Sequence, residues 1–255
     1  MNIDLAGRVA VVTGGGRGIG LAVARALAAE GTDIALLDLL DTVEETAAQI
    51  AQEFGVRAIG HRLDVTDQAA TRAAFALITE RLGVPRVLLT AAGIEINGDS
   101  VDVTAEQWRK VIDVNLTGTF FSTQAFGETL LRAGQTGSAI LISSMSGSIV
   151  NVPQWAASYN SSKAAVAHLA KSLAVEWAAS GIRVNAVAPG YVLTDLTRQI
   201  IEREPSLEAE WVSLIPQGRM ATPEDVAGLV VFLASDVSSY MTAQQVTIDG
   251  GYTAV

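Results

Sequence analysis

Short runs of apolar, β-branched residues alternate along the chain with longer Ala-rich stretches, and this alternation predicts the fold. The stretches between the apolar runs predict helices near 18–30, 42–53, 67–82, 104–133, 156–179 and 222–234. Nearly all-apolar strands that alternate with helices indicate a parallel sheet covered on both faces, as in a doubly wound α/β domain. The apolar runs predict seven strands: "RVAVVT" from Arg8, "DIALLD" from Asp33, "RAIGHRLDV" from Arg57, "RVLLTA" from Arg86, "SAILIS" from Ser138, "RVNAVA" from Arg183 and "QQVTID" from Gln244.

The alternation breaks once, between about residues 190 and 220. The stretch "GYVLTDLTRQIIEREPSLEAEWVSLIPQGRM" inserts short helical runs and two prolines before the last predicted helix. Long insertions of this kind tend to be functional, often as lids over a site. The chain has no evident linker or repeat. We therefore predict a single domain over residues 1–255 with a substrate lid near 190–220.

Composition and charge narrow the function classes. Of the 255 residues, 49% are hydrophobic and 17% are charged, which permits a sizeable core and argues against disorder. The formal net charge of −10 disfavours nucleic acid and anionic membrane surfaces as partners. The chain has no cysteine, and its two histidines, His61 and His168, are isolated, so we expect no metal site. Neither a signal-peptide pattern nor an apolar run of about 20 residues is present, so we expect a cytoplasmic protein.

The first predicted strand runs into the loop "TGGGRGIG", in which Gly14, Gly18 and Gly20 precede a helix. Glycines at such a turn let a pyrophosphate approach the backbone, and the helix start supplies N–H groups and a positive dipole end. A purely structural turn is the alternative. The apolar strand before the loop and the Ala-rich helix after it favour a nucleotide.

Charged residues near this loop bear on the choice of cofactor. Asp38 ends the second predicted strand about twenty residues after the loop, where a carboxylate can accept from the ribose hydroxyls and repel a 2′-phosphate. Asp38 therefore favours NAD over NADP, whereas Arg17 could pair with a 2′-phosphate or be a solvated loop cation. Asp64 closes the third strand and could accept from the adenine amino group. Alternatively, Asp64 or Asp67 caps the next helix.

The segment "YNSSK" places Tyr159 four residues before Lys163 in the first turn of a predicted helix, so both side chains lie on one helix face. Such a pair is ordinary on helices, but it can also be an acid–base device. An ammonium about 4 Å from a phenol, at an effective dielectric of about 20, would stabilise the phenolate by about 4 kcal/mol. The pKa of the phenol would fall from near 10 by up to about 3, which would make Tyr159 a base near neutral pH.

Several motifs now resemble one family in order and spacing, over essentially the whole chain: "TGGGRGIG", "LTAAGI", "VNLTG", "LISSMSG", "YNSSK", "NAVAPGYVLT" and "TIDGGYT". They are similar to the short-chain dehydrogenase/reductase family, and within it to bacterial polyol dehydrogenases of the galactitol or arabinitol kind. The resemblance implies a Rossmann-type fold, a nicotinamide cofactor and a homotetramer. The family usually has asparagine where this chain has Thr90, and we expect the Thr90 hydroxyl to hydrogen-bond locally instead.

The resemblance also implies a catalytic tetrad of Asn115, Ser144, Tyr159 and Lys163. The family pattern selects Ser144 over its neighbours Ser143 and Ser146, and its hydroxyl could hold the substrate oxygen. The implied cofactor contacts are Gly14, Arg17, Gly18, Ile19, Gly20, Asp38, Asp64, Val65, Ala91, Ala92, Gly93, Tyr159, Lys163, Pro189, Gly190, Val192 and Thr194.

Some of the implied positions carry more specific expectations. Asn115 lies inside a long predicted helix, where a kink with a freed carbonyl could hold a water behind Lys163; simple hydrogen-bond satisfaction of its amide is the alternative. After the sixth strand, Pro189 and Gly190 would turn the backbone of Val192 towards the nicotinamide carboxamide. Thr194 could donate to that carboxamide or to the pyrophosphate.

The loop "SIVNVPQ" supplies the expected contacts with the substrate. Ser146, Asn151 and Gln154 could hydrogen-bond substrate hydroxyls beside Ser144 and Tyr159, or they could be solvated loop residues. A small-polyol pocket should be lined by such polar groups, whereas a steroid pocket should be apolar.

Together these features predict an NAD-dependent oxidoreductase that interconverts a secondary alcohol, of the sugar-alcohol kind, and its ketone. A reductase of 3-oxoacyl thioesters or similar carbonyls is one alternative. The other is a nucleotide-sensing protein without catalysis, although all four tetrad positions are occupied by the family's residues. The predicted partners are a small alcohol or ketone substrate and further copies of the chain.

Overall fold

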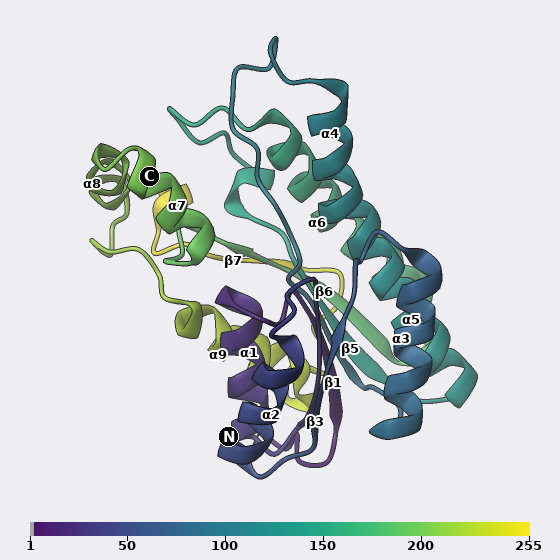
Figure 1. Ribbon diagram of the computed structural model, residues 1–255. Coiled ribbons are helices and arrows are strands. Elements are labelled where there is room, and N and C mark those ends of the chain that lie inside the picture. The colour runs from purple at the N-terminus through teal and green to yellow at the C-terminus, as the bar shows by residue number, and fades with distance from the viewer. Residues whose placement is uncertain (1–2) are drawn as a thin grey trace.

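The computed structural model describes residues 3–255, apart from the side chains of Leu196 and Gln199, and consists of one α/β domain (Figure 1). Its seven strands all pair in parallel, in the order β3-β2-β1-β4-β5-β6-β7. This order confirms the predicted doubly wound sheet. The strands are β1 (Val9–Thr13), β2 (Asp33–Asp38), β3 (Ala58–Arg62), β4 (Val87–Thr90), β5 (Gly137–Ile142), β6 (Ile182–Pro189) and β7 (Gln245–Ile248).

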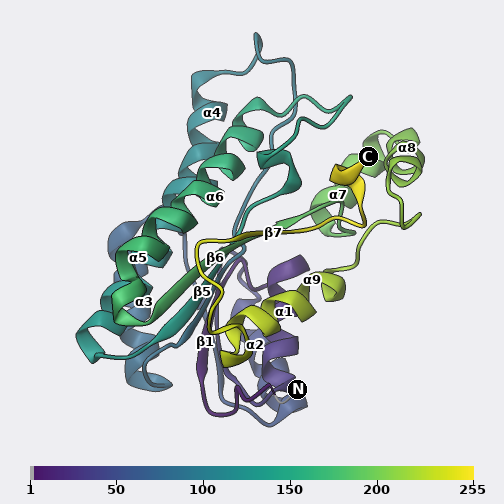
Figure 2. The same ribbon diagram turned by 180° about the vertical axis from the view of Figure 1, so that it is seen from behind.

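Helices cover both faces of the sheet, as the apolar strands require (Figures 1 and 2). One layer contains α1 (Gly18–Ala29), α2 (Val43–Phe54) and α9 (Pro223–Ala234). The opposite layer contains α3 (Gln68–Arg81), α5 (Gly118–Ala133) and α6 (Ala157–Trp177), with α4 (Ala105–Ile112) continuing the line of α5. Each layer has its own core cluster, and β1 contributes Val9 and Val11 to one cluster and Ala10 and Val12 to the other. The alternation of side chains along a strand explains this division.

The long helix predicted over 104–133 is interrupted. A π-helical segment, Asp113–Thr117, separates α4 from α5, and Asn115 lies at its centre. Such segments occur frequently at functional sites. The helix is therefore irregular at Asn115, the position where a kink was predicted.

The insertion after β6 forms two short helices, α7 (Asp195–Arg203) and α8 (Ser206–Leu214), which project beyond the sheet in Figure 1. These helices have a small core of their own, built on Leu207, Trp211, Ile215 and Met220. Tyr191 at the end of β6 packs against this core, with its ring stacked on Trp211 at a centroid distance of 4.3 Å. The insertion is thereby anchored to the carboxyl edge of the sheet. No helix within residues 3–255 is both long enough and apolar enough to cross a membrane.

Candidate active site

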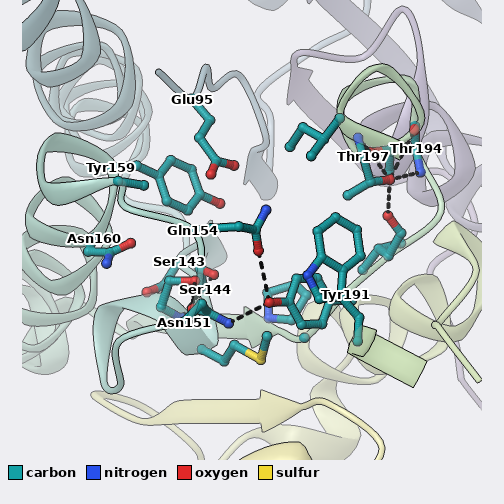
Figure 3. A pocket seen from close by; sticks show the side chains of 18 of the residues that line it. Glu95, Ser143, Ser144, Asn151, Gln154, Tyr159, Asn160, Tyr191, Thr194 and Thr197 are labelled. Atoms are coloured by element: carbon teal, nitrogen blue, oxygen red, sulfur yellow. Dashed lines mark hydrogen bonds between the residues drawn. The ribbon is translucent and has the colours of Figure 1, made fainter. Parts of the chain in front are cut away.

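A pocket opens at the carboxyl ends of β4, β5 and β6, beside α6 and the inserted helices (Figure 3). Ligands of open α/β sheets bind in this position. Ser144, Tyr159, Ser146, Asn151 and Gln154 all line the pocket. The structure therefore brings the predicted substrate contacts together around one cavity.

The three neighbouring serines after β5 have different surroundings. The Ser143 hydroxyl is buried and donates to the Lys163 carbonyl at 2.8 Å, so it fastens the loop to α6. The Ser146 hydroxyl donates to Asn151 Oδ1 at 2.6 Å. Ser144 Oγ accepts from the Ser146 N–H at 3.1 Å, and its hydroxyl remains able to donate into the pocket. This division of hydrogen bonds is consistent with the choice of Ser144.

Tyr191 links the predicted loop residues in a way that the sequence did not reveal. Its hydroxyl accepts from Asn151 Nδ2 at 3.1 Å and donates to Gln154 Oε1 at 3.0 Å. A polar chain from Ser146 through Asn151 and Tyr191 to Gln154 therefore lines one wall of the pocket (Figure 3). These residues are not simply solvated loop positions. Tyr191 belongs to "PGYVLT", in which its neighbours Gly190 and Val192 were predicted as cofactor contacts but Tyr191 was not.

Lys163 is buried on α6 and donates from Nζ to the Ile142 carbonyl at 2.9 Å. Its ammonium lies 5.6 Å from the centroid of the Tyr159 ring. Burial lowers the pKa of Lys163 to about 8, and the negative charge of Glu95 opposes this decrease. The two side chains of "YNSSK" thus lie together at the pocket.

The prediction that the pKa of Tyr159 is lowered is wrong for the polypeptide without the charge of an oxidised cofactor. Burial, followed by the charge of Glu95, raises the pKa of Tyr159 above its usual value, and a hydrogen bond with Ser144 opposes the increase. Removal of a phenol from water disfavours its charged form, and this cost has the largest effect on the pKa of Tyr159. The spacing of Tyr159 and Lys163 is visible in the sequence, whereas the burial of the phenol and the closeness of Glu95 arise only from the fold.

Asn115 is fully buried at the centre of the π-helical segment. Its side chain accepts from the Ile94 N–H at 2.8 Å and donates to the Ile94 carbonyl at 2.9 Å and to Ser162 Oγ at 3.0 Å. The amide is therefore satisfied, as the alternative interpretation expected. The Asn115 carbonyl accepts from the Thr119 hydroxyl at 2.7 Å, which occupies one of its two acceptor positions.

The glycine loop lies close to the chain that follows β4. A Cβ at Gly14, whose φ is +63°, would lie 2.6 Å from Ala92 N, and a Cβ at Gly20 would lie 2.1 Å from the Gly14 carbonyl oxygen. Arg17, at the N-cap of α1, provides no side-chain cap, so the first N–H groups of that helix have no side-chain acceptor at this position. Ile19 follows in the first turn and lines the pocket. The loop thus combines close backbone packing with free donors at a helix start.

Asp38 lies beside this loop at the end of β2. Its carboxylate accepts from the Gly16 N–H at 2.8 Å and from the Leu40 N–H at 3.1 Å. Arg17 is exposed and lies near Asp195, with an N–O distance of 3.9 Å. The acid predicted to select the cofactor is therefore in contact with the loop, whereas the competing cation points towards the insertion.

The choice between Asp64 and Asp67 as the helix cap is settled by the hydrogen bonds. Asp67 is the N-cap of α3 and accepts from the Ala70 N–H at 2.9 Å. Asp64 is exposed and accepts from the N–H and the hydroxyl of Thr66 at 2.9 and 2.7 Å. Val65 between them is buried, against Gly118 of α5.

The remaining predicted cofactor positions lie around the same edge. Ala91, Ala92 and Gly93 follow β4, and a Cβ at Gly93 would lie 3.5 Å from Lys163 Nζ. Pro189, Gly190, Val192 and Thr194 all line the pocket. Thr194 is the N-cap of α7 and lies across from Gly18, where an added Cβ would be 3.6 Å from its methyl group. The Val192 carbonyl accepts from the Thr197 hydroxyl at 2.6 Å.

Several pocket residues besides Tyr191 were not predicted from the sequence, among them Glu95, Asn160 and Trp211. Glu95 stands five residues after the end of β4, and a charged residue so close to the carboxyl end of an apolar strand could have been noticed. Burial raises the pKa of Glu95 to about 6, against the opposing effect of Lys163. Trp211 could not be assigned to the pocket before the packing of the insertion was known. Within residues 3–255, no group of three or more His, Cys, Asp or Glu side chains is arranged to hold a metal ion.

Comparisons with known proteins agree with this architecture. A family model described as "Enoyl-(Acyl carrier protein) reductase" matches residues 14–253. Galactitol 2-dehydrogenase (L-tagatose-forming) of Cereibacter sphaeroides is 43% identical over 253 residues, which cover 98% of this chain and 96% of that protein. A short-chain type dehydrogenase/reductase from Mycobacterium marinum is 40% identical, covers 99% and 98% of the two chains and superposes with a TM-score of 0.94.

A third relative differs in its named substrate. A putative NAD(P) dependent gluconate 5-dehydrogenase from Beutenbergia cavernae, solved with bound NADP at low occupancy, is 38% identical, with 99% of each chain covered and a TM-score of 0.92. The chain therefore belongs to the short-chain dehydrogenase/reductase family. It is an oxidoreductase that acts on CH–OH groups.

Proposed function

We propose that this protein is an NAD-dependent dehydrogenase that interconverts a sugar alcohol and its ketose. The observation that supports this proposal best is the polar wall Ser146–Asn151–Tyr191–Gln154 beside Ser144 and Tyr159. A chain of linked donors and acceptors suits a substrate with several hydroxyls and is poorly suited to an alkyl chain. The similarity to a galactitol dehydrogenase points to the same substrate class.

The residues around the glycine loop fit a nicotinamide dinucleotide. Gly14, where a Cβ would clash with the backbone of Ala91 and Ala92, lies in a strand-to-helix turn of the kind that holds a pyrophosphate, and α1 begins without a side-chain cap. Asp38 would accept hydrogen bonds from the adenosine ribose and would repel a 2′-phosphate, so NAD is preferred to NADP. Asp64 is exposed and could hold the adenine amino group, and Thr194 could donate to the pyrophosphate across from Gly18.

The bound cofactor would supply the acceptor for the hydrogen on the alcohol carbon. Tyr159 would remove the hydroxyl proton at its phenolate oxygen, and Ser144 would hold the substrate oxygen as its charge changes. The positive nicotinamide ring and Lys163 would both favour the phenolate, against the burial that raises the pKa of Tyr159. Asn115 would keep the helix start near Lys163 in place through its bonds to Ile94 and Ser162.

The inserted helices would act as a lid over the substrate. Their core is continuous with Tyr191 and Tyr252, so closure would press the polar wall towards the substrate. The Trp211 Nε1 is buried without a hydrogen-bond partner among the described residues, and this side chain lines the pocket. A substrate hydroxyl would satisfy that donor.

Absorbance of NADH during incubation with a panel of substrates tests the proposal. The panel contains galactitol, other pentitols and hexitols, simple secondary alcohols and, in the reverse direction, 3-oxoacyl thioesters. We expect turnover of at least one polyol, with kcat/KM for NAD more than tenfold above that for NADP. Turnover of thioesters alone would replace the proposal by the reductase alternative, and equal use of both cofactors would remove the proposed role of Asp38.

A further inference from the structure

Glu95 is a half-buried carboxylate inside the pocket that the mechanism above does not use. It lies on the segment after β4, across from the Tyr159 ring. Figure 3 shows its carboxylate and the Tyr159 hydroxyl directed towards the same part of the pocket. The polar wall formed by Asn151, Gln154 and Tyr191 borders that space. A substrate whose reacting oxygen meets Tyr159 would therefore place its neighbouring carbon near Glu95.

The groups that face Glu95 leave it ionised, and within residues 3–255 it forms no ion pair. Lys163 on α6 attracts it but donates its Nζ hydrogen bond to the Ile142 carbonyl. Tyr159 on α6 and Tyr191 after β6 face it as neutral phenols, whose pKa values its charge raises. With its own pKa raised by burial to about 6, Glu95 is mostly charged at neutral pH.

We infer that Glu95 determines substrate specificity by accepting a hydrogen bond from the hydroxyl on the carbon next to the reacting carbon. The pocket would consequently select a neutral vicinal diol and reject a sugar acid. This inference rests on the function proposed above and narrows its substrate class. It also distinguishes the chain's two kinds of relative, because one is named for a neutral polyol and another for gluconate.

Two effects produce the discrimination. A charged acceptor binds a hydroxyl more strongly than a neutral one, whereas a substrate carboxylate offers Glu95 no donor. A carboxylate about 7 Å from Glu95, at an effective dielectric of about 20, would bind about 50-fold more weakly through repulsion alone.

The test compares galactitol, or the polyol that the panel identifies, with the aldonate of the same chain length. KM for the polyol and the inhibition constant of the aldonate are measured for the wild type, Glu95→Gln, Glu95→Asp and Glu44→Gln. We expect Glu95→Gln to raise the polyol KM several-fold and to lower the aldonate constant, so that their ratio shifts by at least tenfold. Glu95→Asp keeps the charge and should stay within about threefold of the wild type, as should Glu44→Gln, which changes an exposed carboxylate on α2.

The pH dependence of inhibition gives a second readout, in which the wild type is compared with Glu95→Gln. The aldonate stays ionised between about pH 8 and pH 5.5, whereas Glu95, with a pKa of about 6, becomes protonated. The inhibition constant of the aldonate should therefore fall several-fold as the pH decreases in the wild type. Lys163 also gains charge over this range and attracts the anion in both proteins, with a pKa that the charge of Glu95 raises in the wild type. Only the difference between the two proteins reports on Glu95.

The outcomes separate this inference from the function on which it rests. If the wild type oxidises no polyol, the proposed function fails. If the wild type oxidises a polyol but the ratio of the two constants is the same in Glu95→Gln, and the pH profiles of the two proteins coincide, the role of Glu95 is overturned. A shifted ratio together with a difference in the pH profiles supports it.

Discussion

At the scale of single residues, burial and the surrounding charges together determine the protonation of Tyr159. The Lys163 ammonium lies 5.6 Å from the centroid of the Tyr159 ring, and Glu95 is a nearby anion whose charge acts to raise the pKa of both residues. Because desolvation dominates, the phenol of Tyr159 resists ionisation in the protein by itself. The positive charge that arrives with an oxidised cofactor therefore has a large part in making Tyr159 a base, and alcohol oxidation should depend on cofactor binding first.

Replacement of Tyr159 by phenylalanine tests its role at this scale. Tyr159→Phe removes the phenol oxygen that is proposed to take the proton, and we expect kcat for polyol oxidation to fall at least about 100-fold. The ring remains, so the dissociation constant of NADH, measured by fluorescence titration, should stay within a few-fold. Tyr191→Phe is the matched control, because it removes a hydroxyl from the same pocket but should change mainly KM. A Tyr159→Phe enzyme with near-normal kcat would contradict the assignment.

The surroundings of two residues, Thr90 and Glu95, could not be predicted from the sequence. The Thr90 hydroxyl is buried with no hydrogen-bond partner among the described residues, so the expected local bond in place of the family's asparagine is wrong. At the end of a parallel strand, the direction of a side chain depends on neighbouring strands that local sequence does not report. Glu95 was missed for the same kind of reason: its importance arises from Lys163 and Tyr159, which are more than sixty residues away in the chain.

At the scale of elements, the sequence predicted most of the architecture, because helix and strand periods and glycine turns are local. All seven strands and the six long helical regions occur near the predicted residues. The π-helical segment could be anticipated from Asn115, a poor helix former in an apolar region. The short helical runs predicted in the insertion occur as α7 and α8. The stacking of Tyr191 on Trp211 could not be anticipated, since tertiary packing determines it.

The start of α9 illustrates how one such local signal stabilises an element. Thr222 and Asp225 form a reciprocal capping box, in which Asp225 Oδ2 accepts from the Thr222 N–H at 2.7 Å. Arg219, at 2.6 Å from the same carboxylate, and the Thr222 backbone lower the pKa of Asp225 to about 2. A depressed pKa means that this contribution is present above about pH 4 and is lost as the pH falls towards 2.

We expect Thr222→Ala to lower the free energy of unfolding by about 1 kcal/mol, because the hydroxyl that caps α9 is removed. Thr222→Ser keeps the cap and should cost less than half as much. Urea unfolding at a fixed protein concentration measures both variants, since any association of chains would change the apparent stability. Equal stability of the alanine and serine variants would show that the cap contributes little in this context.

At the scale of the whole molecule, the helix layer formed by α4, α5 and α6 retains exposed apolar side chains. Val175 on α6 is 76% exposed, Leu131 on α5 is 46% exposed and Trp108 on α4 is 42% exposed. Large apolar side chains on one layer are a feature of interfaces between copies of a chain, and an interface of this kind would be repeated by symmetry. We propose that this layer packs against a second copy and that the protein is a homotetramer.

Light scattering coupled to size exclusion tests the assembly directly. The wild type should have a mass four times the 26.6 kDa of the chain. Val175→Glu places a charge within the proposed interface and should produce a smaller species, while circular dichroism stays unchanged because the side chain contacts solvent in the single chain. Gln52→Glu adds the same charge at an exposed position on α2, in the opposite layer, and should leave the mass unaltered. A wild type that elutes as a single chain would show that the protein forms no such interface and that the site is complete within one chain. A Val175→Glu variant that keeps the full mass would show that the interface lies on another surface.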